Sequence, residues 1–260
     1  MTDNGSINVE VVRGEMQPWS DYSGGRAPAG GPVLVALLAD LLPRASHALV
    51  VGPHGTDVIA AIAARSARTT VLVRSVTDAE ALRDARPDGE VTFVAGSLDG
   101  FVDSLPAGTA FDLVVAADGV DRVMSTDSPQ QDWARRATAL ARTAAAGAVV
   151  VVAAQNDFAL TELFDRRPAH ERHSDDEWWP LHDDPSRPTS PTQLRDALGG
   201  LGLDVTALWS AVDVNGEAHT LLDADAAAAT RPGRPAARLV VRALDVAAAG
   251  APLLAGLGEG

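Results

Sequence analysis

The sequence predicts an α/β protein with a doubly wound, mainly parallel sheet and helices on both of its faces. Short apolar runs recur between residues 48 and 153, and such runs are typical of strands that are buried on both faces. Segments of helical composition alternate with these runs, which is the order of right-handed βαβ units. The length of 260 residues suits one large domain of this kind.

The first predicted element is a helix over residues 32–42, and Pro43 ends it because proline cannot continue a helix. Five buried strands follow, and their apolar runs lie at residues 48–51, 70–73, 91–95, 111–116 and 148–153. The helices expected between these strands lie at residues 58–67, 78–85 and 133–145. This alternation predicts that the five strands are parallel.

The tail of the chain has a different pattern. A polar loop is expected over residues 166–189, and a helix is expected to begin at Pro191, which follows a hydroxyl residue. Asn215 and Gly216 separate two β-like runs and can both take positive φ, which predicts an antiparallel hairpin. We expect this hairpin to complete a seven-stranded sheet. Two alanine-rich helices are expected after it, at residues 224–230 and 235–248.

The composition argues against several classes of function. The formal net charge is −14 and there is no long basic run, so we expect no nucleic-acid partner. Cysteine is absent, which excludes disulfides and thiolate metal sites. No apolar stretch is long enough to span a membrane, and residues 1–10 do not have the pattern of a secretory signal. We therefore expect a cytoplasmic protein without a membrane partner.

Three segments together resemble one known family. The turn after the first strand is VVGPHGT (50–56), the fourth strand and its exit are FDLVVAAD (111–118), and AAG (145–147) precedes the fifth strand. With the order of the elements, they resemble the class I S-adenosylmethionine (SAM)-dependent methyltransferases over residues 32–222. The resemblance implies a Rossmann-like fold, SAM as the cofactor and methyl transfer as the activity.

The chain departs from this family at its cofactor motifs. The family's acidic residue in the first strand falls on Val50, and two glycines of the turn fall on His54 and Thr56. The acid that holds the ribose is replaced by Arg74, and the aspartate near the adenine aligns with Ser97. These departures concern the cofactor contacts and leave the order of elements intact.

Other segments resemble a narrower group, the methyltransferases that tailor actinobacterial natural products, including ribosomally made peptides of the daptide type. They are VLVRS (71–75), AGSL (95–98) and DGVDRVMSTDSPQQDW (118–133). This resemblance implies N-methylation of a peptide amine, with O-methylation or a small-molecule acceptor as alternatives. It leaves a homo-oligomer open.

Twelve residues are candidates for contact with SAM, because ligands of open α/β sheets bind at the carboxyl ends of the strands. They follow the predicted strands or lie in the lead-in, and they are Trp19, Tyr22, Gly52, Pro53, His54, Arg74, Ser75, Gly96, Ser97, Leu98, Ala117 and Asp118. Simpler roles compete with this one. Gly52 would suit a plain tight turn, Arg74 a solvated surface, and Ser97 a helix cap.

The loop 166–189 is the predicted substrate loop, because adjacent tryptophans in a charged loop would enclose an amine or a peptide end. The competing role is a loop pinned to the core by one tryptophan. His182 is the predicted general base, because the pKa of histidine lies near the working pH, and Asp118 is the second catalytic candidate. The substrate candidates are Trp133, Asn156, Phe158, Trp178 and Trp179.

The sequence also gives expectations about ion pairing, metal binding and domain organisation. Asp121 and Arg122 are expected to form a local ion pair, and Asp132 to favour the dipole of the helix that follows it. No metal site is expected, because the histidines and acids near residues 171–184 have no specific spacing. The domain organisation is then a lead-in or lid at 1–31, the methyltransferase core at 32–222 and a helical extension at 223–260.

Two other functions compete with methyl transfer. A reductase that uses NADP would suit Arg74 and Ser75, but the short-chain type needs a tyrosine–lysine pair. The sequence contains no lysine, and its only tyrosine is Tyr22, so that type is excluded. The second competitor is a degenerate methyltransferase fold that acts as the binding partner of another tailoring enzyme.

Overall fold

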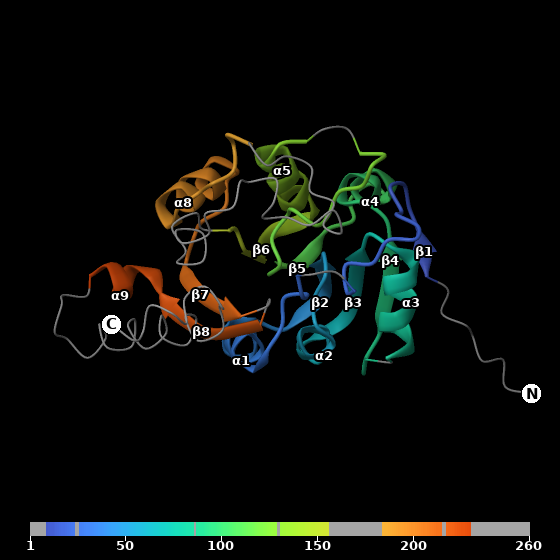
Figure 1. Cartoon of the computed structure of the whole chain (residues 1–260), viewed down its shortest axis with the longest axis horizontal. Coiled ribbons are helices and arrows are strands. Elements are labelled where there is room, and N and C mark those ends of the chain that lie inside the picture. Colours follow the sequence, from blue (N-terminus) through green and yellow to red (C-terminus); the bar gives the residue numbers. More distant parts are fainter. Residues whose placement is uncertain are drawn as a thin grey trace, which may run out of the picture.

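The computed structural model describes residues 9–23, 26–85, 87–128, 131–155, 184–214 and 217–229 (Figure 1). Its strands are β1 (Glu10–Val11), β2 (Ala45–Val51), β3 (Ser66–Val73), β4 (Val91–Ala95), β5 (Phe111–Ala116), β6 (Ala144–Val152), β7 (Trp209–Val214) and β8 (Glu217–Asp223). Its helices are α1 (Pro32–Leu41), α2 (Thr56–Ala63), α3 (Val76–Asp84), α4 (Leu98–Ser104), α5 (Trp133–Thr143), α8 (Pro191–Gly200) and α9 (Ala224–Ala228). None of these helices is long and apolar enough to cross a membrane.

Six strands form one parallel sheet in the order β1-β4-β3-β2-β5-β6. From β2 the chain builds outward through β3 and β4, and then returns to the other side of β2 to add β5 and β6. The strand order therefore reverses between β2 and β5, and such a switch point is where doubly wound sheets bind ligands. The predicted Rossmann-like α/β sheet is confirmed.

Helices cover both faces of this sheet, as Figure 1 shows. Alternate residues of the central strands point to opposite faces. Val50 packs in a cluster with α1, α2 and α3, whereas Leu49 packs in a second cluster with α4, α5 and α8. Because both clusters are apolar and fully buried, they fix the positions of the strand ends that carry the candidate site.

The C-terminal hairpin is present, but it does not extend the parallel sheet. β7 and β8 pair antiparallel in a sheet of their own, and β8 packs beside α1 (Figure 1). Gly30, which precedes α1, makes a bridge to Glu217 of β8, and this contact places the hairpin at the α1 side. The predicted seven-stranded sheet is thus six parallel strands plus a separate pair. The turn at 215–216 lies outside the described residues.

Several boundaries differ from prediction. β3 starts at Ser66, inside the predicted helix 58–67, because pairing of Ser66 with Ala45 overrides the helix propensity of the alanines before it. Strand β1 and helix α4 were not predicted from the sequence, since both elements are short. The first predicted C-terminal helix is α9, and the second lies outside the described residues.

Candidate functional site

The loops at the carboxyl edge of the sheet bring together the residues predicted to hold SAM. Gly52 directly follows β2 and has a φ of 87°, which glycine adopts without strain. A Cβ on Gly52 would lie 3.4 Å from the Val123 side chain, so the turn packs closely against the segment after β5. This turn stands at the switch point between β2 and β5.

His54 joins the two strands at the switch point through its ring. Its Nε2 accepts a hydrogen bond from the backbone N–H of Ala117 at 3.0 Å, and its Nδ1 lies 3.0 Å from the Gly52 carbonyl. Since Nε2 accepts from an amide, the proton of the neutral ring lies on Nδ1 and is donated to Gly52. His54 is fully buried, and burial lowers the pKa of its ring. A neutral imidazole thus fills the space between the ends of β2 and β5.

An N-terminal segment crosses this edge of the sheet, and we call residues 12–31 the strap; positions 24–25 of it lie outside the described residues. It runs from β1 to α1 (Figure 1). The Tyr22 hydroxyl donates to the His54 carbonyl at 2.9 Å and accepts from the His54 N–H at 3.1 Å. The Arg74 guanidinium lies over the Trp19 ring, with its Cζ 5.4 Å from the ring centroid. Both aromatic residues therefore lie at the predicted cofactor edge.

Arg74, at the end of β3, is buried and paired with an acid of the strap. Its Nε donates to Asp21 Oδ2 at 2.9 Å, and a second bond joins its terminal nitrogen to Asp21 Oδ1. A third bond runs to the Met124 carbonyl at 3.1 Å. Only 1% of the Arg74 side chain is exposed, which excludes the solvated surface role. Asp21 was not predicted, and no local sequence signal links it to a residue 53 positions away.

Asp118 follows β5 and is held by Arg122, one helical turn later in the sequence. Arg122 Nε donates to Asp118 Oδ2 at 2.8 Å, and both side chains are buried. The remaining donors of Arg122 bind the strap carbonyls of Arg26 and Ala27, each at 2.9 Å. The predicted Asp121–Arg122 pair is therefore wrong, because Arg122 turns towards the strap.

Asp121 forms a different buried pair, with Arg136 of α5. Arg136 donates to Asp121 Oδ1 at 2.9 Å and lies 3.7 Å from Asp184. Burial raises the pKa of Asp121 and lowers that of Arg136, since each ion is withdrawn from water. Asp184 also accepts the backbone N–H of Trp133, and so fixes the start of α5. This pairing connects β5, α5 and the segment before α8.

Two predicted cofactor residues cap helices. Ser75 accepts from the Thr77 N–H at the start of α3, and Ser97 accepts from the Gly100 N–H at the start of α4. Ser97 also donates to the Arg13 carbonyl of the strap at 3.1 Å. Asp132 caps α5 in the same way. The capping role considered from the sequence for Ser97 is therefore present, and Ser75 caps a helix as well.

The other predicted residues take these positions. The Pro53 carbonyl accepts from the Ala29 N–H of the strap at 3.3 Å, and the Leu98 N–H donates to the Val123 carbonyl at 2.7 Å. A Cβ on Gly96 would collide with Val12 of the strap. Trp133, the first residue of α5, is buried in the core, and its indole N–H has no hydrogen-bond partner among the residues that the structure describes. The remaining candidates lie outside the described residues, and they are Asn156, Phe158, Trp178, Trp179 and His182.

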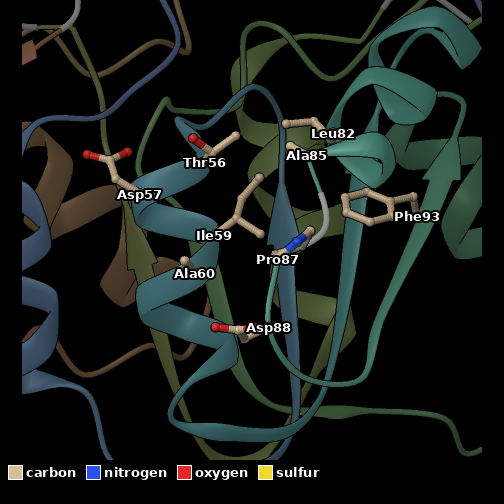
Figure 2. Close-up of a pocket in the computed structure, with 9 residues that line it drawn as sticks. All are labelled: Thr56, Asp57, Ile59, Ala60, Leu82, Ala85, Pro87, Asp88 and Phe93. Atoms are coloured by element: carbon tan, nitrogen blue, oxygen red, sulfur yellow. The ribbon is translucent and has the colours of Figure 1, made fainter.

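A cavity of about 340 Å³ lies elsewhere, between α2, α3 and β4 (Figure 2). Its buried walls are apolar and include Ile59, Leu82 and Phe93. Asp88 lies at its rim, whereas the Asp57 side chain points away from it in Figure 2. No residue that lines it was predicted to bind SAM, so this cavity and the predicted site are different places.

The polar side chains at the carboxyl edge do not fit an adenosyl cofactor while the strap lies on them. Such a ligand needs hydrogen-bonding groups that it can reach, yet His54 bonds to Ala117, and Arg74 to Asp21. Asp118 is likewise bonded to Arg122 and is only 6% exposed. We therefore assign no chemical step to these groups in the strap-bound conformation.

No protein-family model and no curated protein matches this chain. Among solved structures it is similar to the N-methyltransferase NodS from Bradyrhizobium japonicum WM9 in complex with S-adenosyl-L-homocysteine (SAH), with 14% identity and a TM-score of 0.34, over 44% of this chain and 54% of NodS. The chain thus spans about half the length of NodS. It is also similar to magnesium protoporphyrin IX methyltransferase (ChlM) from Synechocystis PCC 6803 with bound SAH, with 16% identity and a TM-score of 0.44, over 71% and 76% of the two chains.

A third similar structure comes from work on the conversion of a disulfide bond into a thioacetal group during echinomycin biosynthesis. It is 26% identical with a TM-score of 0.43, and the similarity covers 77% of this chain and 82% of that one. All three TM-scores lie below 0.5, so the functional proposal rests on this chain's own residues.

Proposed function

We propose that this chain is a SAM-dependent methyltransferase whose cofactor binds at the carboxyl ends of β2, β3, β4 and β5. The observation that carries the proposal is Gly52, which makes a close turn with positive φ at the switch point of a doubly wound sheet. Further support comes from the resemblance of the turn 50–56 and of the segment 111–118 to class I methyltransferases. In such an enzyme SAM supplies the methyl group, and the protein supplies position and electrostatics.

The acceptor that we propose is the amine of a peptide or a small molecule, with a hydroxyl as the alternative. The resemblance of segment 118–133 to natural-product tailoring enzymes supports this choice. The net charge of −14 supports it as well, because a negative field draws cationic amines towards the protein. We also propose His182 as the base that removes the acceptor proton.

One observation favours a second function, that of a binding partner with no cofactor. Arg74 stands where the family has a ribose-binding acid, and it is fully engaged with Asp21 and Met124. A degenerate fold that no longer binds SAM would have no need to keep this edge open. The two functions differ in a simple property, which is whether the protein binds SAH.

Calorimetric titration with SAH, with NADPH titrated in parallel, separates these functions. We expect wild-type protein to bind SAH and Gly52→Trp to lose at least tenfold in affinity, because the indole would fill the turn. Gly108→Trp is the matched control, since Gly108 also has positive φ (83°) but faces open space. Folded wild-type protein that gives no heat with SAH would favour the binding-partner function.

A methyl-transfer assay tests the chemistry. With labelled SAM and a panel of amine and hydroxyl acceptors, we expect label to appear on an amine. His182→Gln should lower the turnover number by about 10² or more without changing SAH affinity, which is the usual effect of removing a general base. An unchanged turnover number would exclude His182 from proton transfer.

A further inference from the structure

We propose that the strap and the cofactor compete for the carboxyl edge, so that SAM enters only when the strap detaches, with Asp21 and Arg74 as the latch. This inference rests on the proposed function and deepens it. It explains why the polar side chains predicted to bind SAM form hydrogen bonds with other residues of the chain, although the edge has the glycine turn that a cofactor site needs. The strap thereby sets the affinity for the cofactor.

The path of the strap is the first line of support. It touches the ends of four strands in their order in the sheet, and each contact involves a backbone group. At β4, the Ser97 N–H donates to the Arg13 carbonyl at 3.1 Å; at β3, the Met16 N–H donates to the Arg74 carbonyl at 2.9 Å. At β2, the Gly55 N–H donates to the Ala29 carbonyl at 2.9 Å. Arg122 completes the path after β5.

The close fit of the strap is a second line of support. Gly14 has a φ of 86°, and a Cβ there would lie 2.2 Å from the Ser97 hydroxyl oxygen. A Cβ on Gly100 would lie 2.0 Å from the Arg13 carbonyl oxygen. Glycine on both sides of the contact lets the two backbones approach closely. These contacts leave no room even for an added Cβ, so no adenine or ribose can lie between the strap and the start of α4 here.

Two buried arginines at the ends of the strands bind the strap through hydrogen bonds. Arg74 holds the Asp21 carboxylate, and Arg122 holds carbonyls of Arg26 and Ala27 while pairing with Asp118. Both guanidinium groups come from the sheet side of the contact. Each is 3% exposed or less, so neither can meet a ligand until the strap has moved.

The nature of these contacts makes the strap displaceable. The described residues between β1 and α1 form no helix, and many of the strap's links to the sheet are hydrogen bonds and ion pairs, whose groups water can solvate once the strap detaches. Its anchor β1 pairs with β4 through only two residues, at the edge of the sheet. The strap can therefore leave without disturbing the pairing of β2, β3 and β5.

Competition has a measurable consequence. If only a fraction of molecules has the strap detached, the apparent dissociation constant of SAH rises by the inverse of that fraction. Weakening the latch should then tighten binding. We expect Asp21→Asn to raise SAH affinity about tenfold, because the strap-bound state loses its ion pair while detachment lets Arg74 reach water. Asp84→Asn, which alters an exposed pair with Arg83, is the matched control.

A reversible lock gives the decisive experiment. The chain has no cysteine, so Ser20→Cys with Asp78→Cys introduces the only two thiols. The Ser20 hydroxyl donates to an Asp78 carboxylate oxygen at 2.6 Å, so these two side chains face each other, and titration of free thiols establishes that the disulfide forms on oxidation. We expect calorimetry to show SAH binding to the reduced double variant, at least a tenfold loss of affinity on oxidation, and full recovery with dithiothreitol.

A second arm separates competition from a lid that closes over bound cofactor. With saturating SAH present before oxidation, we expect the disulfide to form at least tenfold more slowly, because the bound ligand keeps the strap away. Equal SAH affinity of the oxidised and reduced forms, or unchanged oxidation with SAH, would overturn the inference alone. Absence of SAH binding in wild type, in Asp21→Asn and in the reduced variant would instead overturn the proposed function, and this inference with it.

Discussion

The interior of the sheet and its carboxyl edge are both buried, but they are built from opposite kinds of residue. Between the sheet and α1, α2 and α3 the chain buries aliphatic side chains such as Val50 of β2 and Ile62 of α2. At the edge the chain buries the ion pairs Asp21–Arg74, Asp118–Arg122 and Asp121–Arg136. Apolar burial stabilises a fold, whereas a buried ion pair adds little net stability. The difference indicates that the edge is shaped for something other than stability.

Removing one partner of the Asp21–Arg74 latch is expected to change stability more than any other substitution at the edge. Arg74→Met leaves the Asp21 carboxylate buried without its partner, so we expect a loss of about 3–5 kcal/mol in the free energy of unfolding. Replacing both residues, with Asp21→Leu added, should recover most of it. Urea unfolding of the wild type, the single variant and the double variant measures this. Equal losses in the single and double variants would show that the pair itself stabilises the fold.

A smaller effect is the pH dependence that His54 confers. Burial lowers the pKa of His54, so below its ordinary value of 6.5 the unfolded chain binds a proton that the folded protein does not. Stability from this group is therefore complete above pH 6.5 and is lost as the pH falls, by at most about 1.4 kcal/mol per pH unit. We expect His54→Gln to remove this slope in urea unfolding between pH 7.5 and 5.5. An unaltered slope would show that other titratable groups cause the pH dependence of stability.

The smallest effect concerns Ser75, which caps α3 and is also a predicted cofactor contact. Ser75→Ala and Ser190→Ala should each lower the free energy of unfolding by about 1 kcal/mol, because each serine accepts a bond from the first turn of its helix. Ser190 caps α8 and is not a predicted cofactor contact. If Ser75 also binds the cofactor, Ser75→Ala weakens SAH binding and Ser190→Ala does not. Equal SAH affinity of the two variants would show that Ser75 only caps its helix.

The interior was predictable from sequence, and the edge only in part. Apolar runs such as 91–95 and 111–116 coincide with β4 and β5, since all their residues are buried and apolar except the exposed second ones, Thr92 and Asp112. The turn at Gly52 was also predictable, because a glycine follows the apolar run of the first predicted strand. The short helix α4 was missed because its sequence LDGFVDS contains a glycine, which is there for the strap backbone and not for the helix.

The long-range pairs at the edge had no local sequence signal. Arg74 and Asp21 are 53 positions apart, and only the folded chain brings them together. Arg122 and Asp121 are adjacent in sequence, yet each pairs with a different residue because tertiary contacts decide where a long side chain turns. The composition of the site was therefore visible in the sequence, whereas its closed state was not.

A crystal structure grown with SAH would show whether the cofactor and the strap occupy the same edge of the sheet. We expect adenosine against the Gly52 turn, Asp21 separated from Arg74, and the strap lifted from the ends of β2 and β3. SAH bound in the cavity between α2 and α3, with the Asp21–Arg74 pair intact, would contradict it.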